Sequence, residues 1–286
     1  MLEGSSFFAD AEASYATAKA VVFGVPFDAT SSFRKGAAQA PGAIREAGWN
    51  FETFDVLSGL DLSKVSVHDY GDLPATESSS EMINNVQTFM ASLLQKNKFP
   101  LCLGGDHSVT IGCVREFPKD TMVVSLDAHL DYRDSYEDNP CNHACVMRRI
   151  SEHVGVENMI VLGVRSAEYD EWMRAKQDGV SVITSQVVTR NGISHALRSL
   201  QKKIQGNPVY LTIDIDVLDP MFAPGTSTPE PHGLTPDHIW KCVAMLAPSL
   251  IGADIVEVCP PYDKGETALL AAKLARYILG LVFKST

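Results

Sequence analysis

The segment Met122-Val-Val-Ser-Leu-Asp127-Ala-His129-Leu-Asp131 places three possible metal ligands directly after a short run of apolar residues. Such a run is typical of a buried strand in a parallel sheet. Alternate residues of an extended chain share one face, so Asp127, His129 and Asp131 are predicted to point toward one place. Neighbouring buried carboxylates are unfavourable unless a cation or a proton neutralises them. A divalent metal ion is the simplest group that would do so.

A second segment, Val209-Tyr-Leu-Thr-Ile-Asp214-Ile-Asp216-Val-Leu-Asp219-Pro220, repeats this arrangement. An apolar strand again ends in carboxylates on one face, those of Asp214 and Asp216. Together the two strand ends offer more ligands than one six-coordinate ion usually takes from a protein. Two metal ions that share bridging carboxylates would use them all.

A third segment, Leu103-Gly-Gly-Asp106-His107-Ser108, adds a histidine where another strand is expected to end. Its glycines permit a tight turn and a close approach of the backbone. Each of the three motifs alone has an ordinary structural interpretation, because strand ends often carry polar turns. At successive strand ends they reinforce one another.

Apolar segments of strand length alternate with helical patterns along most of the chain. We expect strands at 20–27, 64–70, 99–103, 122–126, 159–164, 180–184, 209–215 and 252–258, and helices at 78–94, 167–178, 193–204, 235–246 and 267–283. This alternation predicts an α/β fold with a mostly parallel sheet, either open or closed into a barrel. In both, functional residues collect at the carboxyl ends of the strands. Without an internal repeat or a linker, residues 1–286 are predicted to form one domain.

The formal charge of −11 and the absence of a Lys/Arg cluster argue against binding to nucleic acid. The same charge is compatible with a small cationic substrate. No apolar run approaches the roughly 20 residues that span a bilayer, and the first residues do not resemble a signal peptide. Six scattered cysteines are typical of reduced core residues. We therefore expect a cytoplasmic protein without a membrane partner.

The three motifs together resemble the signatures of the ureohydrolase family, which comprises arginases, agmatinases and their relatives. The resemblance extends from about Gly24 to the C-terminus. It implies a three-layer α/β sandwich with an eight-stranded, mostly parallel sheet, and so an open sheet. It also implies two Mn²⁺ ions per subunit and a homotrimer or homohexamer.

The resemblance further implies which residues bind the metal. One Mn²⁺ would be held by His107, Asp127, Asp131 and Asp214, and the other by Asp127, His129, Asp214 and Asp216. Oxygen ligands with one imidazole per ion suit Mn²⁺ better than a metal that prefers thiolates. Asp106 and Asp219 belong to the same motifs but are not expected to bind metal.

The implied reaction is hydrolysis of a guanidino compound to urea and an amine by a hydroxide that bridges the metals. By resemblance, Asp131 holds that hydroxide and passes its proton to the leaving nitrogen, and Glu257 binds the guanidinium group. His143 matches a loop histidine proposed as a proton shuttle, although the glycine usual after it is Ala144 here. The ordinary alternatives are a structural ion pair for Glu257 and an unremarkable loop histidine for His143.

The substrate is expected to be agmatine, giving putrescine and urea in polyamine biosynthesis. Segments 225–231 and 256–263 look more like agmatinases than arginases, and three acids in loop 132–142 would repel a substrate carboxylate: Asp134, Glu137 and Asp138. The ordinary alternative is that these acids form a solvated loop. His232 would narrow the pocket for the substrate tail or have no effect. Aminopropylagmatine, arginine, guanidino acids and formiminoglutamate are alternative substrates. A non-catalytic ureohydrolase-like binding protein is disfavoured, because all six ligands and Glu257 are present.

Overall fold

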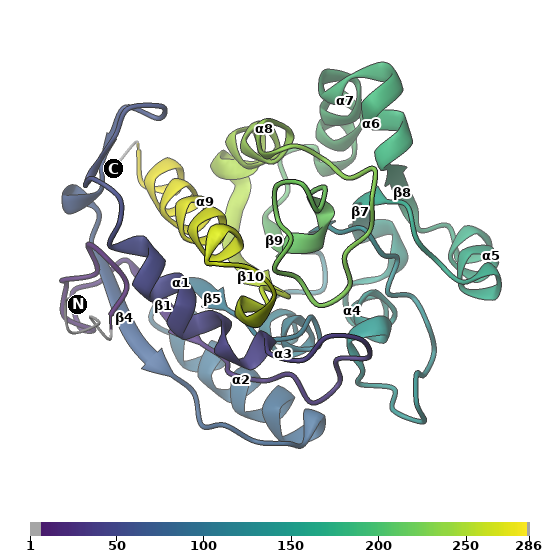
Figure 1. The fold of residues 1–286 in the computed structure, drawn as a ribbon, viewed down its shortest axis with the longest axis horizontal. Coiled ribbons are helices and arrows are strands. Elements are labelled where there is room, and N and C mark those ends of the chain that lie inside the picture. The colour runs from purple at the N-terminus through teal and green to yellow at the C-terminus, as the bar shows by residue number, and fades with distance from the viewer. Residues whose placement is uncertain (1–6, 285–286) are drawn as a thin grey trace.

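The computed structural model describes residues 7–284, which are built around one eight-stranded sheet (Figure 1). The sheet contains β1 (Ala20–Gly24), β4 (Val67–Asp72), β5 (Phe99–Leu103), β6 (Met122–Leu126), β7 (Met159–Val164), β8 (Ser181–Thr184), β9 (Val209–Asp214) and β10 (Leu250–Val256). Their order is β4-β1-β5-β10-β9-β6-β7-β8, and every neighbouring pair is parallel. All eight expected strands are confirmed. The sheet is open, with β4 and β8 at its edges.

Helices cover both faces of the sheet and complete the expected three layers (Figure 1). One face carries α2 (Ser79–Leu94), α3 (Val109–Val114), α4 (Val146–Val154) and α5 (Tyr169–Asp178). The other carries α1 (Ala40–Gly48), α6 (Ser185–Asn191), α7 (Ile193–Ile204), α8 (Pro236–Leu246) and α9 (Glu266–Val282). The apolar core therefore forms two layers, one on each side of the sheet.

The five expected helices are present, but several short elements were not predicted. These are α1, α3, α4, α6 and the small hairpin of β2 (Phe54–Asp55) and β3 (Leu60–Asp61). In α3 all six residues are buried, so its sequence lacks the alternation of apolar and polar faces by which a helix is recognised. Short helices of this kind depend on tertiary packing for their stability.

The strand order brings the three sequence motifs together. β5 and β6 are consecutive strands in the sequence. In the sheet, however, β10 and β9 lie between them. In an open α/β sheet, ligands bind outside the carboxyl ends of the strands where the strand order reverses. The ends of these four central strands are where the motifs lie.

All six cysteines are free thiols, as expected, and five of them are buried. Within residues 7–284, no helix combines the length and the apolar character that a membrane crossing requires.

Candidate metal centre and catalytic cleft

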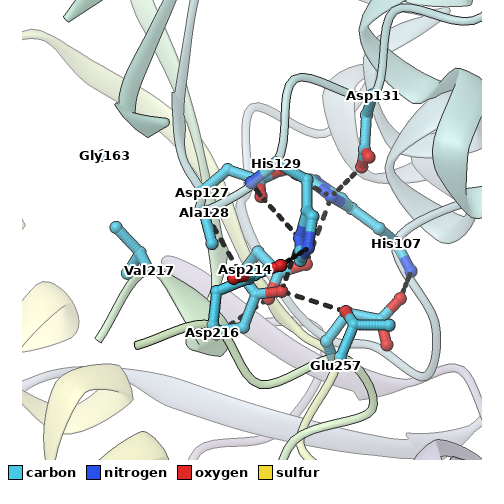
Figure 2. A network of polar contacts seen from close by, with 12 residues as sticks. His107, Asp127, Ala128, His129, Asp131, Gly163, Asp214, Asp216, Val217 and Glu257 are labelled. Carbon is cyan, nitrogen blue, oxygen red and sulfur yellow. Dashed lines mark hydrogen bonds and ion pairs between the residues drawn. The ribbon is translucent and has the colours of Figure 1, made fainter. Parts of the chain in front are cut away.

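His107 lies among three carboxylates at the carboxyl ends of the central strands (Figure 2). Its Nδ1 is 3.0 Å from Asp131 Oδ2, 3.2 Å from Asp127 Oδ2 and 3.5 Å from Asp214 Oδ2. His107 follows β5, Asp127 and Asp131 follow β6, and Asp214 ends β9. Residues more than a hundred positions apart in the chain thus converge on one ring nitrogen.

His129 forms the second half of the cluster. Its Nδ1 is 2.9 Å from Asp216 Oδ2 and 3.8 Å from Asp127 Oδ1. Two groups offer ligand atoms that all lie within 4.8 Å of one another: His107, Asp127 and Asp214, and Asp127, His129 and Asp216. Asp127 belongs to both groups. The structure therefore brings together all six residues for which metal binding was predicted.

The cluster brings four carboxylates together with two imidazoles, and this proximity shifts the pKa values of both kinds of group. Burial, with repulsion from Asp131, raises the pKa of Asp127 to about 6, and burial, with repulsion from Asp216 and Asp127, raises the pKa of Asp214 well above its usual value. Burial would lower the pKa of His129, but the carboxylates of Asp216 and Asp127 outweigh it and raise that pKa to about 10. Without metal, protonated imidazoles therefore supply the positive charge.

One oxygen of the cluster allows a test of whether these residues fit a metal ion. Asp127 Oδ2 is buried and accepts no hydrogen bond among the described residues, although His107 Nδ1 is only 3.2 Å away. A buried carboxylate oxygen without a partner is unfavourable. Converging oxygen atoms, two imidazoles and this unpaired oxygen fit divalent cations with a preference for oxygen ligands.

The two further motif acids accept hydrogen bonds from nearby backbone N–H and hydroxyl groups. Asp106 is fully buried, and its carboxylate accepts hydrogen bonds from Thr30 and Ser108. Asp219 accepts from the backbone N–H groups of Met221 and Gly233. Neither acid belongs to the two ligand groups.

Glu257 leaves β10 beside this cluster with only one of its oxygens engaged. Its Oε1 accepts a hydrogen bond of 2.7 Å from the backbone N–H of His107, whereas Oε2 is buried without a partner in the described part of the chain. Burial raises the pKa of the carboxyl to about 7. A cationic group that met Oε2 would favour the charged form.

His143 lies at the rim of the same cleft with its ring orientation set by Thr30. Its Nδ1 is 2.5 Å from the Thr30 carbonyl oxygen, which can only accept, so Nδ1 carries a hydrogen. Nε2 is 3.3 Å from Ser32 Oγ and is the nitrogen left to exchange protons. Ala144 is absent from the described residues with positive φ, so this position does not need glycine.

The cleft above the cluster is polar, with a volume of about 170 Å³. The residues that line it beyond the cluster are Ser32, Arg133, Tyr136, His143, Ala144, Ser166, Ala167, Glu171, Thr228 and Glu257. Glu171 is buried, and its carboxylate is 3.5 Å from Arg133 Nε. His232 is exposed and lines a different cavity.

The acids of loop 132–142 do not line this cleft. The prediction that they meet the substrate was therefore wrong, and they form a solvated loop. Asp134 is 3.0 Å from Arg149 and its side chain is 87% exposed, while Glu137 and Asp138 are exposed to solvent. The same loop instead contributes Arg133 and Tyr136. The sequence pattern gave the position of the loop but not the direction of its side chains.

Sequence reasoning also missed Arg165. Its guanidinium group donates to the backbone carbonyls of Gly163, Asp216, Val217, Leu218, Glu230 and Pro231. These contacts hold the turn that carries Asp216 against the loop around Glu230. Arg165 directly follows β7, so the rule that functional residues collect at strand ends would have found it.

Comparisons with known proteins agree with this arrangement. The model of the Arginase family matches residues 18–280. An agmatinase of Bacillus cereus is 34% identical over 280 residues, covering 95% of this chain and 94% of the relative. An N(1)-aminopropylagmatine ureohydrolase of Thermococcus kodakarensis is 37% identical over 93% of this chain and 92% of its own. The crystal structure of agmatine ureohydrolase of Thermoplasma volcanium has a TM-score of 0.94, with 38% identity and coverage of 99% and 96%.

Proposed function

This chain belongs to the arginase family, and on that premise we propose that it hydrolyses agmatine to putrescine and urea. The observation that carries the proposal is Glu257, a buried carboxylate beside a cluster of metal-type ligands, with one oxygen that accepts no hydrogen bond of ordinary geometry from residues 7–284. A guanidinium group supplies the N–H donors that such an oxygen lacks.

We propose that the cluster holds two Mn²⁺ ions. His107, Asp127, Asp131 and Asp214 would hold one, and Asp127, His129, Asp214 and Asp216 the other. The position of Asp127 in both ligand groups supports a bridging role. Two such ions lower the pKa of a shared water and supply hydroxide near neutral pH.

The side chains of this chain would bind the substrate and move its protons. Hydrolysis joins the water oxygen to the guanidinium carbon and breaks the bond between that carbon and the nitrogen that bears the alkyl chain. Glu257 would hold the guanidinium group through Oε2, fixing the planar carbon for attack. The leaving nitrogen must gain a proton, which Asp131 would pass on from the attacking water. His143 would exchange the remaining proton with solvent through Nε2.

The choice of agmatine now depends on Glu171 rather than on the loop acids. Glu171 lines the cleft as a buried carboxylate. Its negative charge balances the positive charge of Arg133, the one arginine among the residues that line the cleft. Glu257 is assigned to the guanidinium group, so Glu171 is the acid of the cleft wall that is left to meet the tail of the substrate. This charge favours a substrate whose tail carries an amine over one whose tail carries a carboxylate.

Urea release from the Mn²⁺-reconstituted protein tests the proposal with four substrates in parallel: agmatine, arginine, guanidinobutyrate and aminopropylagmatine. We expect the highest kcat/KM with agmatine. Aminopropylagmatine is the second candidate, because the Thermococcus relative named for that activity is 37% identical. Faster turnover of arginine would keep the chemistry and refute the amine-tailed substrate. Inactivity with all four would refute the proposed reaction.

The assembly and the compartment are further proposals. Leu57 and Phe222 line an exposed, mainly apolar groove beside α8 and α9, with a volume of about 760 Å³, which supports a homo-oligomer. We propose a homotrimer or homohexamer, to be measured by light scattering after size exclusion.

Six free thiols support a reducing compartment, and hence a cytoplasmic protein. We also propose that residues 1–286 form one domain, because one sheet draws strands from Ala20 to Val256.

A further inference from the structure

A row of polar side chains lies inside the sheet beneath the ligand cluster. Tyr210, Thr212 and Asp214 alternate along β9 and therefore share one face of the strand. Thr212 pairs in register with Asp254 of the neighbouring strand β10. Tyr210, Thr212 and Asp254 are all 0% exposed. Buried polar groups in the middle of a sheet are costly unless they are hydrogen-bonded, so their partners need an explanation.

His107 connects this row to the cluster through its second ring nitrogen. Nδ1 faces the carboxylates of Asp127, Asp131 and Asp214, whereas Nε2 is 3.0 Å from Thr212 Oγ1. An imidazole that binds metal through Nδ1 is neutral and carries its hydrogen on Nε2. Nε2–H must then donate to the Thr212 hydroxyl.

The Thr212 hydroxyl, once it accepts from His107, has its own hydrogen to donate. Asp254 Oδ2 already accepts 2.7 Å from the Tyr210 hydroxyl, and Oδ1 is buried without a hydrogen bond of ordinary geometry in residues 7–284. Burial raises the pKa of the Asp254 carboxyl, and the hydroxyls of Thr212 and Thr110 reduce this rise. Thr212 Oγ1 also lies 3.3 Å from Thr110 Oγ1, and Asp254 is the carboxylate that pairs in register with Thr212.

Asp254 is not explained as a structural ion pair. Among the described residues it forms no salt bridge, and its strand neighbour on the other side is Cys102, whose thiol pKa is raised by burial and further raised by Cys113 and Asp254. A buried carboxylate without a counter-ion reduces stability unless its hydrogen bonds compensate. Its hydrogen bond among the described residues comes from Tyr210, and its register partner Thr212 is the residue that reaches His107.

We propose that Asp254, acting through Thr212, is a positioning residue for the metal ligand His107. In this proposal the Thr212 hydroxyl accepts from Nε2–H and donates in turn to Asp254. Such a chain would fix the ring so that its bare Nδ1 faces the metal, and it would make Nδ1 a stronger ligand. This inference depends on the metal centre proposed above.

Mn²⁺ affinity of the full chain tests the proposal with one pair of substitutions at Thr212. Thr212→Val keeps the shape and removes the hydroxyl, whereas Thr212→Ser keeps the hydroxyl. In a calorimetric titration we expect Thr212→Val to raise the Kd of one of two Mn²⁺ sites by about 10- to 100-fold. Thr212→Ser should stay within about threefold of the unmodified protein, because the hydrogen-bond chain remains. Asp254→Asn, which removes the charge at the far end, should weaken the same site.

Thr121→Val is the matched control. Thr121 is also fully buried, its hydroxyl has no partner in the described part of the chain, and it precedes β6, at the end of that strand away from the cluster. Its substitution should leave both Mn²⁺ affinities unchanged. Thermal unfolding in the presence of a chelator separates a structural role from the proposed one, because bound metal then makes no contribution to stability.

Two results would overturn the inference. If Thr212→Val and Asp254→Asn lower the midpoint of unfolding but keep the unmodified Mn²⁺ affinities, the row is only structural and the metal centre still holds. If the unmodified protein binds no Mn²⁺, the metal centre fails and this inference fails with it. Should Thr212→Val not fold, the titration of Asp254→Asn decides.

Discussion

Asp131 and Glu257 both adopt the left-handed backbone conformation, with φ of 50° and 65°. For residues other than glycine this conformation costs about 1–2 kcal/mol. Hydrogen bonds hold both in place: the Asp131 carbonyl accepts from Met147 N–H at 2.9 Å, and Glu257 N–H donates to the Gly105 carbonyl at 2.8 Å. Strain that the surrounding structure imposes on two charged residues in one cleft is typical of functional sites.

Replacing Asp127 tests the bridging role at the residue scale. We expect Asp127→Asn to abolish binuclear Mn²⁺ occupancy, because one carboxylate serves both ligand groups. Metal analysis after gel filtration would measure it. Saturating Mn²⁺ at 100 times its Kd should add about 2.7 kcal/mol per site to the free energy of unfolding of the unmodified protein and far less to that of the variant. Two bound ions and full activity in Asp127→Asn would contradict the bridging assignment.

Replacing Glu257 separates substrate binding from metal binding. Glu257→Gln keeps the shape but removes the charge that would meet the guanidinium group, so kcat/KM for agmatine should fall by about 100-fold. Its Mn²⁺ content should match the unmodified protein, because Glu257 lies outside both ligand groups. Loss of metal together with activity would instead make Glu257 part of the metal site.

At the scale of elements, the turn after β5 depends on a close approach of two backbones. A Cβ at Gly105 would lie 1.8 Å from the Phe27 carbonyl oxygen, and one at Gly104 would lie 2.7 Å from a side-chain carbon of Val256. Asp106 N–H donates to the same Phe27 carbonyl at 2.7 Å. The glycines therefore allow the loop that carries His107 to pass against the segment after β1.

Gly105→Ala should destabilise the fold, because the carbonyl it would meet belongs to the backbone and cannot rotate away. We expect the free energy of unfolding to fall by about 3 kcal/mol, measured by urea denaturation. Gly42→Ala is the control: it lies in α1 with nothing within 4 Å of a Cβ, so it should gain about 0.5–1 kcal/mol from helix propensity. Equal effects of the two substitutions would refute the close-approach argument.

At the scale of the whole molecule, α9 ties the end of the chain to its beginning. Lys273 Nζ is 2.6 Å from Asp55 Oδ1, and Arg276 pairs with Asp10 while its second nitrogen donates 2.8 Å to the Glu52 carbonyl. These contacts join segments more than two hundred residues apart. They hold the hairpin of β2 and β3 and the preceding segment against the last helix.

The Asp55–Lys273 pair predicts a pH dependence of stability. Burial raises the pKa of Asp55, but the hydrogen bonds from Lys273 and Ser58 outweigh it and lower that pKa. A carboxyl whose pKa is lowered by folding stabilises the protein above its unfolded pKa, about 4, and loses this contribution as the pH falls through its folded pKa. In chelator, the difference in unfolding free energy between the unmodified protein and Asp55→Asn should be constant above about pH 5 and narrow below about pH 4.

The control for this titration is the surface pair Asp237–Lys241, with both side chains more than half exposed. Asp237→Asn should show little difference at any pH, because exposed pairs contribute little. A difference for Asp55→Asn that stays constant down to pH 3 would show that the ion pair does not contribute to the pH dependence.

The sequence by itself determined the features that depend on neighbours in the chain. Apolar runs predicted all eight strands, Thr235 caps α8 as its position before Pro236 indicates, and Gly179 ends α5 in the left-handed conformation. Alternation along a strand, a local property, predicted five of the residues that gather at the strand ends. The glycine turn after a third strand and the resemblance to the family added His107. Recognition of the family then favoured an open sheet over a barrel.

Only the tertiary structure decided what depends on strand order and on the packing of loops. It placed β10 and β9 between β5 and β6, and so brought His107 onto Asp127 and Asp214. It turned Arg133 rather than Asp134 toward the cleft, and it set Thr212 beside Asp254 in register. A single sequence carries no signal for these pairings, because they join residues that are distant in the chain and depend on which segments pack together.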